Sequence, residues 1–287
     1  MTVRTWVDRT YPSRDGLRLH YREYPGPGAP RLALLCLAGL TRNARDFEVI
    51  APRIARTRRV LCADLRGRGR SQHDPHWEHY SAAVYVADLL DLLDHAGVRR
   101  LLLLGTSLGG ILSMLLAAAR PSAVAGVILN DVGPEVASEG LRRIATDVGR
   151  LAPVGSWEEA VAQARATYGH ALPGLSEAQW QAFARRTYSE VAGVPRLDMD
   201  PRIGDAVRAT PVGAAPNLWP AFAALESIPT LAIRGALSDL LSAETFDRMA
   251  SVKPDLERVT VPDRGHPPLL DEPVCDAAID AFLGRLP

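Results

Sequence analysis

Residues 101–110 read LLLLGTSLGG, and this stretch decides the fold. The four leucines are typical of a short buried strand, and the apolar run from Leu108 onward is typical of a buried helix. Between them, residues 105–109 form a G-x-S-x-G pentapeptide, which predicts a tight strand-to-helix turn with Ser107 at its tip. Glycines on both sides of Ser107 leave room for the close backbone contacts that such a turn requires.

Short apolar segments recur along the chain and alternate with helical patterns. The predicted strands cover residues 17–24, 31–37, 60–63, 100–104, 124–129, 230–233 and 256–261. This alternation predicts the α/β class, with a mostly parallel sheet flanked by helices.

The alternation stops between Gly133 and Leu225. That segment reads as several amphipathic helices, including Trp157 to Tyr168 and Ser176 to Tyr188, with no evident strand. We therefore predict one core made of residues 1–132 and 226–287, with residues 133–225 inserted as a helical cap.

Composition restricts the classes of partner. Basic and acidic residues number 33 each, so no strong field favours nucleic acid or an anionic membrane surface. We expect a small-molecule substrate and a monomer or homodimer. Three widely spaced cysteines favour reduced thiols, and the first ten residues lack the apolar stretch of a signal peptide, which together predict a cytoplasmic protein. Residues 101–119 carry no charge, but their glycines favour a buried strand and helix over a membrane span.

The start of the helix after Ser107 predicts a site for a developing anion. Unpaired N–H groups and the positive dipole end gather at a helix N-terminus, so the Leu108 N–H is expected to donate to an oxyanion. A second donor is expected from another loop. Leu40 follows the predicted strand at 31–37 and is the candidate for its backbone N–H.

A serine hydroxyl needs a base before it can act as a nucleophile. His266 lies in a loop after the last predicted strand and is the candidate base. Asp239, after the strand that ends near Ile233, is expected to orient the histidine, and Asp131, after the preceding strand, remains the alternative. This chemistry requires no metal and no cofactor.

Other residues are weaker candidates. Arg42 follows the oxyanion loop, where it is placed to reach a substrate carboxylate or to hold only loop backbone. Trp157, Trp180 and Trp219 lie in or near the cap and are candidates for lining an apolar pocket, although aromatic residues at helical spacing also pack a cap internally.

A group of histidines is a further candidate, for a metal site. His73, His76 and His79, with Asp74 and Glu78 nearby, do not match a familiar zinc spacing, so solvated loop residues are favoured over a metal site.

Five segments together resemble the α/β-hydrolase superfamily, over nearly the full length of the chain. They are CLAGL (36–40), ADLRGRGRS (63–71), GTSLGG (105–110), RGALSDLL (234–241) and DRGHPPLLDEP (263–273). Within the superfamily, the chain is similar to capped esterases, enol-lactonases and carbon-carbon bond hydrolases, and this resemblance implies Ser107, Asp239 and His266 as a triad. One position departs from the pattern, because Ala38 stands where many relatives have histidine, which leaves open how the oxyanion loop is braced.

These features predict hydrolysis of small to medium carboxylic esters through an acyl-enzyme on Ser107. The alternative is cleavage of an enol-lactone, or of a carbon-carbon bond beside a ketone, by the same residues. A protein that only holds a ligand in its capped pocket is the least favoured reading.

Overall fold

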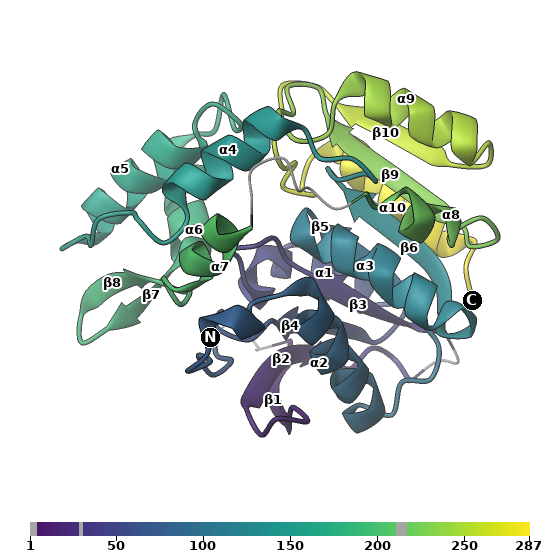
Figure 1. Cartoon of the computed structure of the whole chain (residues 1–287), viewed down its shortest axis with the longest axis horizontal. Coiled ribbons are helices and arrows are strands. Elements are labelled where there is room, and N and C mark those ends of the chain that lie inside the picture. The colour runs from purple at the N-terminus through teal and green to yellow at the C-terminus, as the bar shows by residue number, and fades with distance from the viewer. Residues whose placement is uncertain (1–4, 29–30, 211–216) are drawn as a thin grey trace.

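A computed structural model describes residues 5–28, 31–210 and 217–287. An eight-stranded sheet lies at its centre (Figure 1). In spatial order its strands are β1 (Val7–Pro12), β2 (Arg18–Tyr24), β4 (Val60–Asp64), β3 (Ala33–Leu37), β5 (Leu101–Thr106), β6 (Val124–Asn130), β9 (Thr230–Gly235) and β10 (Glu257–Val261). The six strands from β4 to β10 run parallel, whereas β2 pairs antiparallel with both β1 and β4. The predicted mostly parallel sheet is confirmed.

Both faces of the sheet are covered by helices (Figure 1). The helices of this core are α1 (Ile50–Ile54), α2 (Ala82–His95), α3 (Leu108–Ala119), α8 (Trp219–Ala223), α9 (Ala243–Val252) and α10 (Pro273–Gly284), with short 3-10 turns at Ala44–Phe47, Trp77–His79 and Pro121–Ala123. Alternate residues of β3 serve opposite faces: Leu35 packs in the cluster that α2 and α3 cover, and Leu34 packs in the cluster that α1 and α10 cover. Because successive side chains of a strand point to opposite faces, a strand covered on both sides must be apolar throughout, which explains the continuous apolar runs in the sequence.

The inserted segment forms a separate layer beside one end of the sheet (Figure 1). It contains α4 (Ser138–Asp147), α5 (Trp157–Tyr168), α6 (Glu177–Thr187), a hairpin of β7 (Tyr188–Val191) and β8 (Val194–Leu197), and α7 (Ile203–Ala209). No strand was expected here, so the hairpin is a difference from the prediction. Its two-residue turn is Ala192-Gly193, with positive φ at both residues, and this pair lacks the usual Asn-Gly or Asp-Gly signal.

Helix α8 lies within residues 133–225 but packs with the core. Phe222 and Leu225 are buried in the same apolar cluster as the residues of α3. Helix α8 therefore packs on the core although the sequence placed it in the inserted segment, and the boundary at residue 225 stays a prediction. Residues 211–216, which precede α8, lie outside the described residues.

Two further expectations concern the whole chain. Cys36, Cys62 and Cys275 are free and buried. Within the described ranges, no helix combines the length and the apolar character needed to cross a bilayer.

Candidate active site

Ser107 sits at a strained turn between β5 and α3. Its φ of 53° lies in the left-handed region, and its N–H donates to the Asn130 carbonyl at 3.0 Å. The flanking glycines are required because any larger side chain would collide with the backbone. A Cβ on Gly105 would lie 2.2 Å from the Gly109 carbonyl oxygen, and a Cβ on Gly109 would lie 2.1 Å from the Leu37 carbonyl oxygen. The predicted tight turn is therefore present, and it places Ser107 on the wall of a cavity.

Ser107, His266 and Asp131 form one chain of polar contacts. His266 Nε2 lies 2.9 Å from Ser107 Oγ, and His266 Nδ1 lies 2.7 Å from Asp131 Oδ2. Asp131 is fully buried, and its carboxylate also accepts hydrogen bonds from the Gly235 N–H at 2.7 Å and the Ser238 hydroxyl at 2.6 Å. These hydrogen bonds fix the position of the Asp131 carboxylate. In this arrangement the Ser107 hydroxyl can pass its proton to one nitrogen of the His266 imidazole while the other nitrogen donates to the carboxylate.

Asp239 was the expected partner of His266, and the structure contradicts that assignment. Its carboxylate forms a two-bond ion pair with Arg143 of α4, at 2.7 and 2.9 Å. Burial opposes ionisation of Asp239, but the bonds to Arg143 outweigh it and lower the pKa of this carboxyl. Asp239 ties the cap to the core, and Asp131, the alternative left open by the sequence, takes the place beside His266.

Asn130 links the turn to the histidine loop. Its side-chain amide donates to Thr106 Oγ1 at 3.1 Å and to the Pro268 carbonyl at 3.0 Å. The loop that carries His266 is thereby fixed to the ends of β5 and β6. Nothing in the sequence pattern singled out this residue.

The loop that carries Leu40 lies beside Ser107. A Cβ on Gly39 would lie 3.7 Å from Ser107 Cβ, and Leu40 itself lines the cavity. Leu108 is the first residue of α3, where a backbone N–H has no acceptor within its own helix. The structure thus brings the loop of Leu40 and the start of α3 to the same serine.

Arg68 braces the Leu40 loop, which answers the question raised by Ala38. This buried arginine donates from Nε to the Leu40 carbonyl at 2.8 Å and from Nη1 to Tyr85 Oη at 2.8 Å. Its guanidinium carbon lies 4.8 Å from the centroid of the Tyr85 ring. Arg68 belongs to the segment ADLRGRGRS (63–71), which is part of the resemblance to the superfamily, but the sequence analysis gave Arg68 no role.

The cavity above Ser107 lies between the core and the cap. Its core wall includes Thr106, Ser107, His266 and the Leu40 loop. Its apolar cap wall includes Ile144, Val148, Leu151, Leu172, Phe183 and Met199. An apolar cavity that contains a few fixed polar groups is the usual form of a small-molecule site.

The three tryptophans expected at this cavity are absent from the described residues that line it. Trp157 stacks beneath Arg185 and donates to Glu190 at 3.1 Å, and Trp219 donates to Glu135 at 2.5 Å. Trp180 is buried in the interior of the cap. These predictions were wrong because helical spacing does not reveal whether an aromatic face points to a cavity or to a neighbouring helix.

Arg42 does line the cavity, but its donors are already engaged. It pairs with Asp46 through Nε at 2.9 Å and Nη2 at 2.5 Å, and it hydrogen-bonds to Thr187. Its guanidinium carbon lies 4.5 Å from the centroid of the Phe183 ring. The contacts favour the structural role that the sequence left open, joining the oxyanion loop to the cap.

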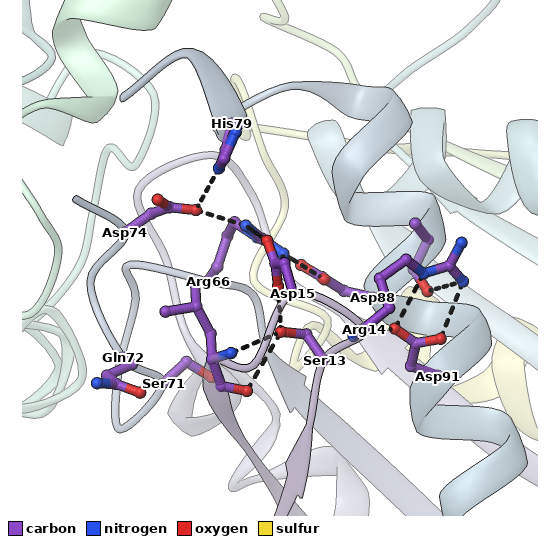
Figure 2. Close-up of polar contacts among 12 residues, drawn as sticks. Ser13, Arg14, Asp15, Arg66, Ser71, Gln72, Asp74, His79, Asp88 and Asp91 are labelled. Atoms are coloured by element: carbon purple, nitrogen blue, oxygen red, sulfur yellow. Dashed lines mark hydrogen bonds and ion pairs between the residues drawn. The ribbon is translucent and has the colours of Figure 1, made fainter. Parts of the chain in front are cut away.

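The histidine-rich loop belongs to a different polar cluster, shown in Figure 2. His79 Nδ1 lies 3.0 Å from Asp74 Oδ2, and these groups with Asp15 lie close enough to suggest cation ligands. However, the buried guanidinium of Arg66 already pairs with Asp15, Asp74 and Asp88 at 2.5 to 2.9 Å. Because Arg66 already donates to all three carboxylates and offsets part of their charge, the cluster is a structural ion-pair network between β1–β2, the loop after β4, and α2.

Comparison with known proteins shows the family to which the chain belongs. A sequence profile described as the alpha/beta hydrolase fold matches residues 33–273. The chain is 35% identical to a 3-hydroxybutyrate-oligomer hydrolase of Cupriavidus necator, over 92% of each chain, and 28% identical to a 2-(acetamidomethylene)succinate hydrolase of Mesorhizobium japonicum, over 81% of each. It also matches the crystal structure of an alpha/beta hydrolase from Novosphingobium aromaticivorans with a TM-score of 0.92 and 45% identity, covering 98% of this chain and 99% of the other.

Proposed function

Because the chain belongs to the α/β-hydrolase family and is a hydrolase, we propose that it cleaves carboxylic esters with Ser107 as nucleophile, His266 as general base and Asp131 as the orienting carboxylate. The observation that carries this proposal is the continuous contact from Ser107 Oγ through His266 to Asp131, with distances of 2.9 and 2.7 Å. A serine and an imidazole at this separation can exchange a proton without rearrangement.

The mechanism follows from these contacts. His266 Nε2 takes the Ser107 proton as Oγ attacks the ester carbonyl, and the resulting imidazolium gives that proton to the leaving alcohol. A water then attacks the acyl-enzyme as His266 removes its proton, and the proton returns to Ser107 when the acid leaves. The backbone N–H groups of Leu40 and Leu108 stabilise the negative oxygen in both halves of the reaction.

A relative favours esters among the possible substrates. The relative from Cupriavidus necator is named for hydrolysing 3-hydroxybutyrate oligomers, and hydroxy acids oligomerise through ester bonds. The apolar cap wall of the cavity suits short branched acyl groups of this kind. We therefore propose short hydroxy-acid oligoesters as the substrate class, with no metal or cofactor taking part.

A chromogenic short-chain ester tests the proposed nucleophile. Ser107→Ala is expected to reduce kcat by about 10⁴-fold or more, because the remaining oxyanion donors and binding contacts give only residual catalysis. Activity that survives this substitution at the wild-type level would refute the assignment.

A substrate panel tests the kind of bond that is cleaved. The same triad and oxyanion donors serve enol-lactone or carbon-carbon bond cleavage beside a ketone, and the relative from Mesorhizobium japonicum is named for a substrate that is not a simple ester oligomer. Preference for lactones or diketones over linear esters in kcat/KM would select this alternative.

A further inference from the structure

Arg186 is a largely buried cation at this cavity whose guanidinium is not engaged in an ion pair or hydrogen bond by any described residue. It lies near the end of α6, its side chain is largely buried with a residue exposure of 7%, and it lines the same cavity as Ser107. Within residues 5–28, 31–210 and 217–287, its guanidinium takes part in no ion pair or hydrogen bond. A guanidinium has five N–H donors, and those of Arg186 lie at a cavity in which no described residue accepts them.

The other arginines at the cavity differ in this respect. Arg42 is paired with Asp46, and Arg143 is paired with Asp239, each through two or more bonds. Asp147 also lines the cavity and pairs with no cation among the described residues, but it is only partly buried, so water screens its charge more than that of Arg186. Among the described residues that line the cavity, Arg186 is therefore an arginine whose guanidinium pairs with no lining carboxylate.

One hydrogen bond and one electrostatic interaction locate Arg186 in the structure. Its backbone carbonyl accepts a hydrogen bond from Asn43 Nδ2 at 3.1 Å, which fixes this end of α6 to the segment after the oxyanion loop. On the other side, burial and Glu272 raise the pKa of Asp271, and the charge of Arg186 partly offsets that rise. Asp271 directly follows Leu270, which lines the cavity, so Arg186 lies between α6 and the loop that carries His266.

We propose that Arg186 binds a free carboxylate of the substrate while the ester bond lies at Ser107. A guanidinium presents parallel donors that match the two oxygens of a carboxylate, and a bond between charged partners in a desolvated cavity is stronger than a neutral one. This inference rests on the proposed esterase function and narrows it to esters that end in a carboxylate. Apolar contacts with the cap wall hold the segment between the two groups.

Turnover of a matched substrate pair tests the proposal. The first substrate is the linear dimer of 3-hydroxybutyrate with its free carboxylate, and the second is the same dimer with that carboxylate converted to a primary amide, both followed by product chromatography. The wild-type enzyme is expected to prefer the carboxylate form by about tenfold or more in kcat/KM, and Arg186→Gln is expected to remove most of that preference, mainly through KM. A wild-type enzyme without the preference, or an R186Q variant that keeps it, overturns the proposal.

A neighbouring arginine supplies the matched control. Arg185 lies on the same helix but is exposed, stacks on Trp157 and does not line the cavity, so Arg185→Gln is expected to keep the wild-type preference. Arg186→Lys retains the charge without the planar pair of donors and is expected to show an intermediate preference. Loss of preference in R185Q equal to that in R186Q would assign the effect to the general charge of the cap.

Binding separates failure of this inference from failure of the proposed function. In a Ser107→Ala background, titration calorimetry with the carboxylate dimer is expected to show binding that R186Q weakens by about tenfold or more. If the wild type turns over neither dimer but R186Q still weakens binding, the ester reaction is wrong and the carboxylate site stands. If turnover occurs but R186Q leaves the dissociation constant unchanged, the site is wrong and the reaction stands.

Discussion

Asp131 Oδ2 lies 2.7 Å from His266 Nδ1, while Asp239 faces Arg143. Both aspartates follow neighbouring parallel strands, since β6 pairs with β9 and each strand ends at the same edge of the sheet. Of the two, Asp131 alone is fully buried and hydrogen-bonded to the imidazole. The two carboxyl groups are therefore expected to respond differently to the same substitution.

The first prediction compares the two aspartates. Asp131→Asn is expected to lower kcat by about 10³- to 10⁴-fold, because an amide NH₂ facing Nδ1 favours the wrong imidazole tautomer and cannot stabilise the imidazolium. Asp239→Asn removes a bond to Arg143 but leaves the histidine contacts intact, so kcat is expected to fall less than about tenfold. Initial rates on a short-chain ester measure kcat for both variants. Equal losses of kcat would contradict the assignment of Asp131, and a larger loss in the Asp239 variant would reverse it.

The sequence could predict some of this site because the signals are local. GTSLG at 105–109 determines the turn around Ser107 within five residues, and His266 is marked by its place after the last strand. The acid is different: two strand ends offer an aspartate, and only the packing of the loops shows that Gly235 and Ser238 turn toward Asp131. Arg186 lies at a cap position whose orientation depends on tertiary packing, so its unpaired charge has no sequence signature.

The second prediction concerns the brace on the oxyanion loop. Arg68→Lys keeps the charge but removes the fixed set of donors that joins Leu40 to Tyr85, so the loop is expected to move and kcat to fall by about 10- to 100-fold with a smaller change in KM. Tyr85→Phe removes one acceptor and leaves the bond to Leu40, and its effect is expected to be smaller. The pH profile should retain its shape in both variants because Asp131 and His266 are untouched; a shifted profile would indicate that Arg68 acts on the histidine instead.

The third prediction is a pH dependence of stability at the Arg66 cluster (Figure 2). Hydrogen bonds from Arg66 lower the pKa of Asp15 from 3.8 to about 2, despite some burial. A carboxyl whose pKa is lowered by folding stabilises the folded state above its unfolded pKa, and that contribution is lost as the pH falls from about 4 toward 2. Because more than a third of the Asp15 side chain is exposed, we expect a contribution of only about 1 kcal/mol or less.

Asp15→Asn isolates that contribution from the buried carboxyl groups around it. The difference in unfolding free energy between wild type and variant is expected to be present at pH 6 and to shrink as the pH falls below about 4, as measured by urea denaturation at each pH. A difference that stays constant down to the acid limit would mean that Asp15 acts through packing or neutral hydrogen bonds, not through its charge.

The fourth prediction tests the close approach of α3 to β3. Alanine at Gly109 would place its Cβ 2.1 Å from the Leu37 carbonyl oxygen and 2.6 Å from the carbonyl carbon, and both atoms belong to backbone that the sheet holds in place. Gly109→Ala is expected to cost about 1–3 kcal/mol or more in unfolding free energy. Gly284→Ala, at the end of α10 with nothing within 4 Å of the new Cβ, is expected to stay within about 0.5 kcal/mol of wild type. Since β3 leads directly to the Leu40 loop, any G109A protein that folds should also lose kcat, and a G109A protein as stable and active as G284A would show that the turn around Ser107 is less tight than its contacts indicate.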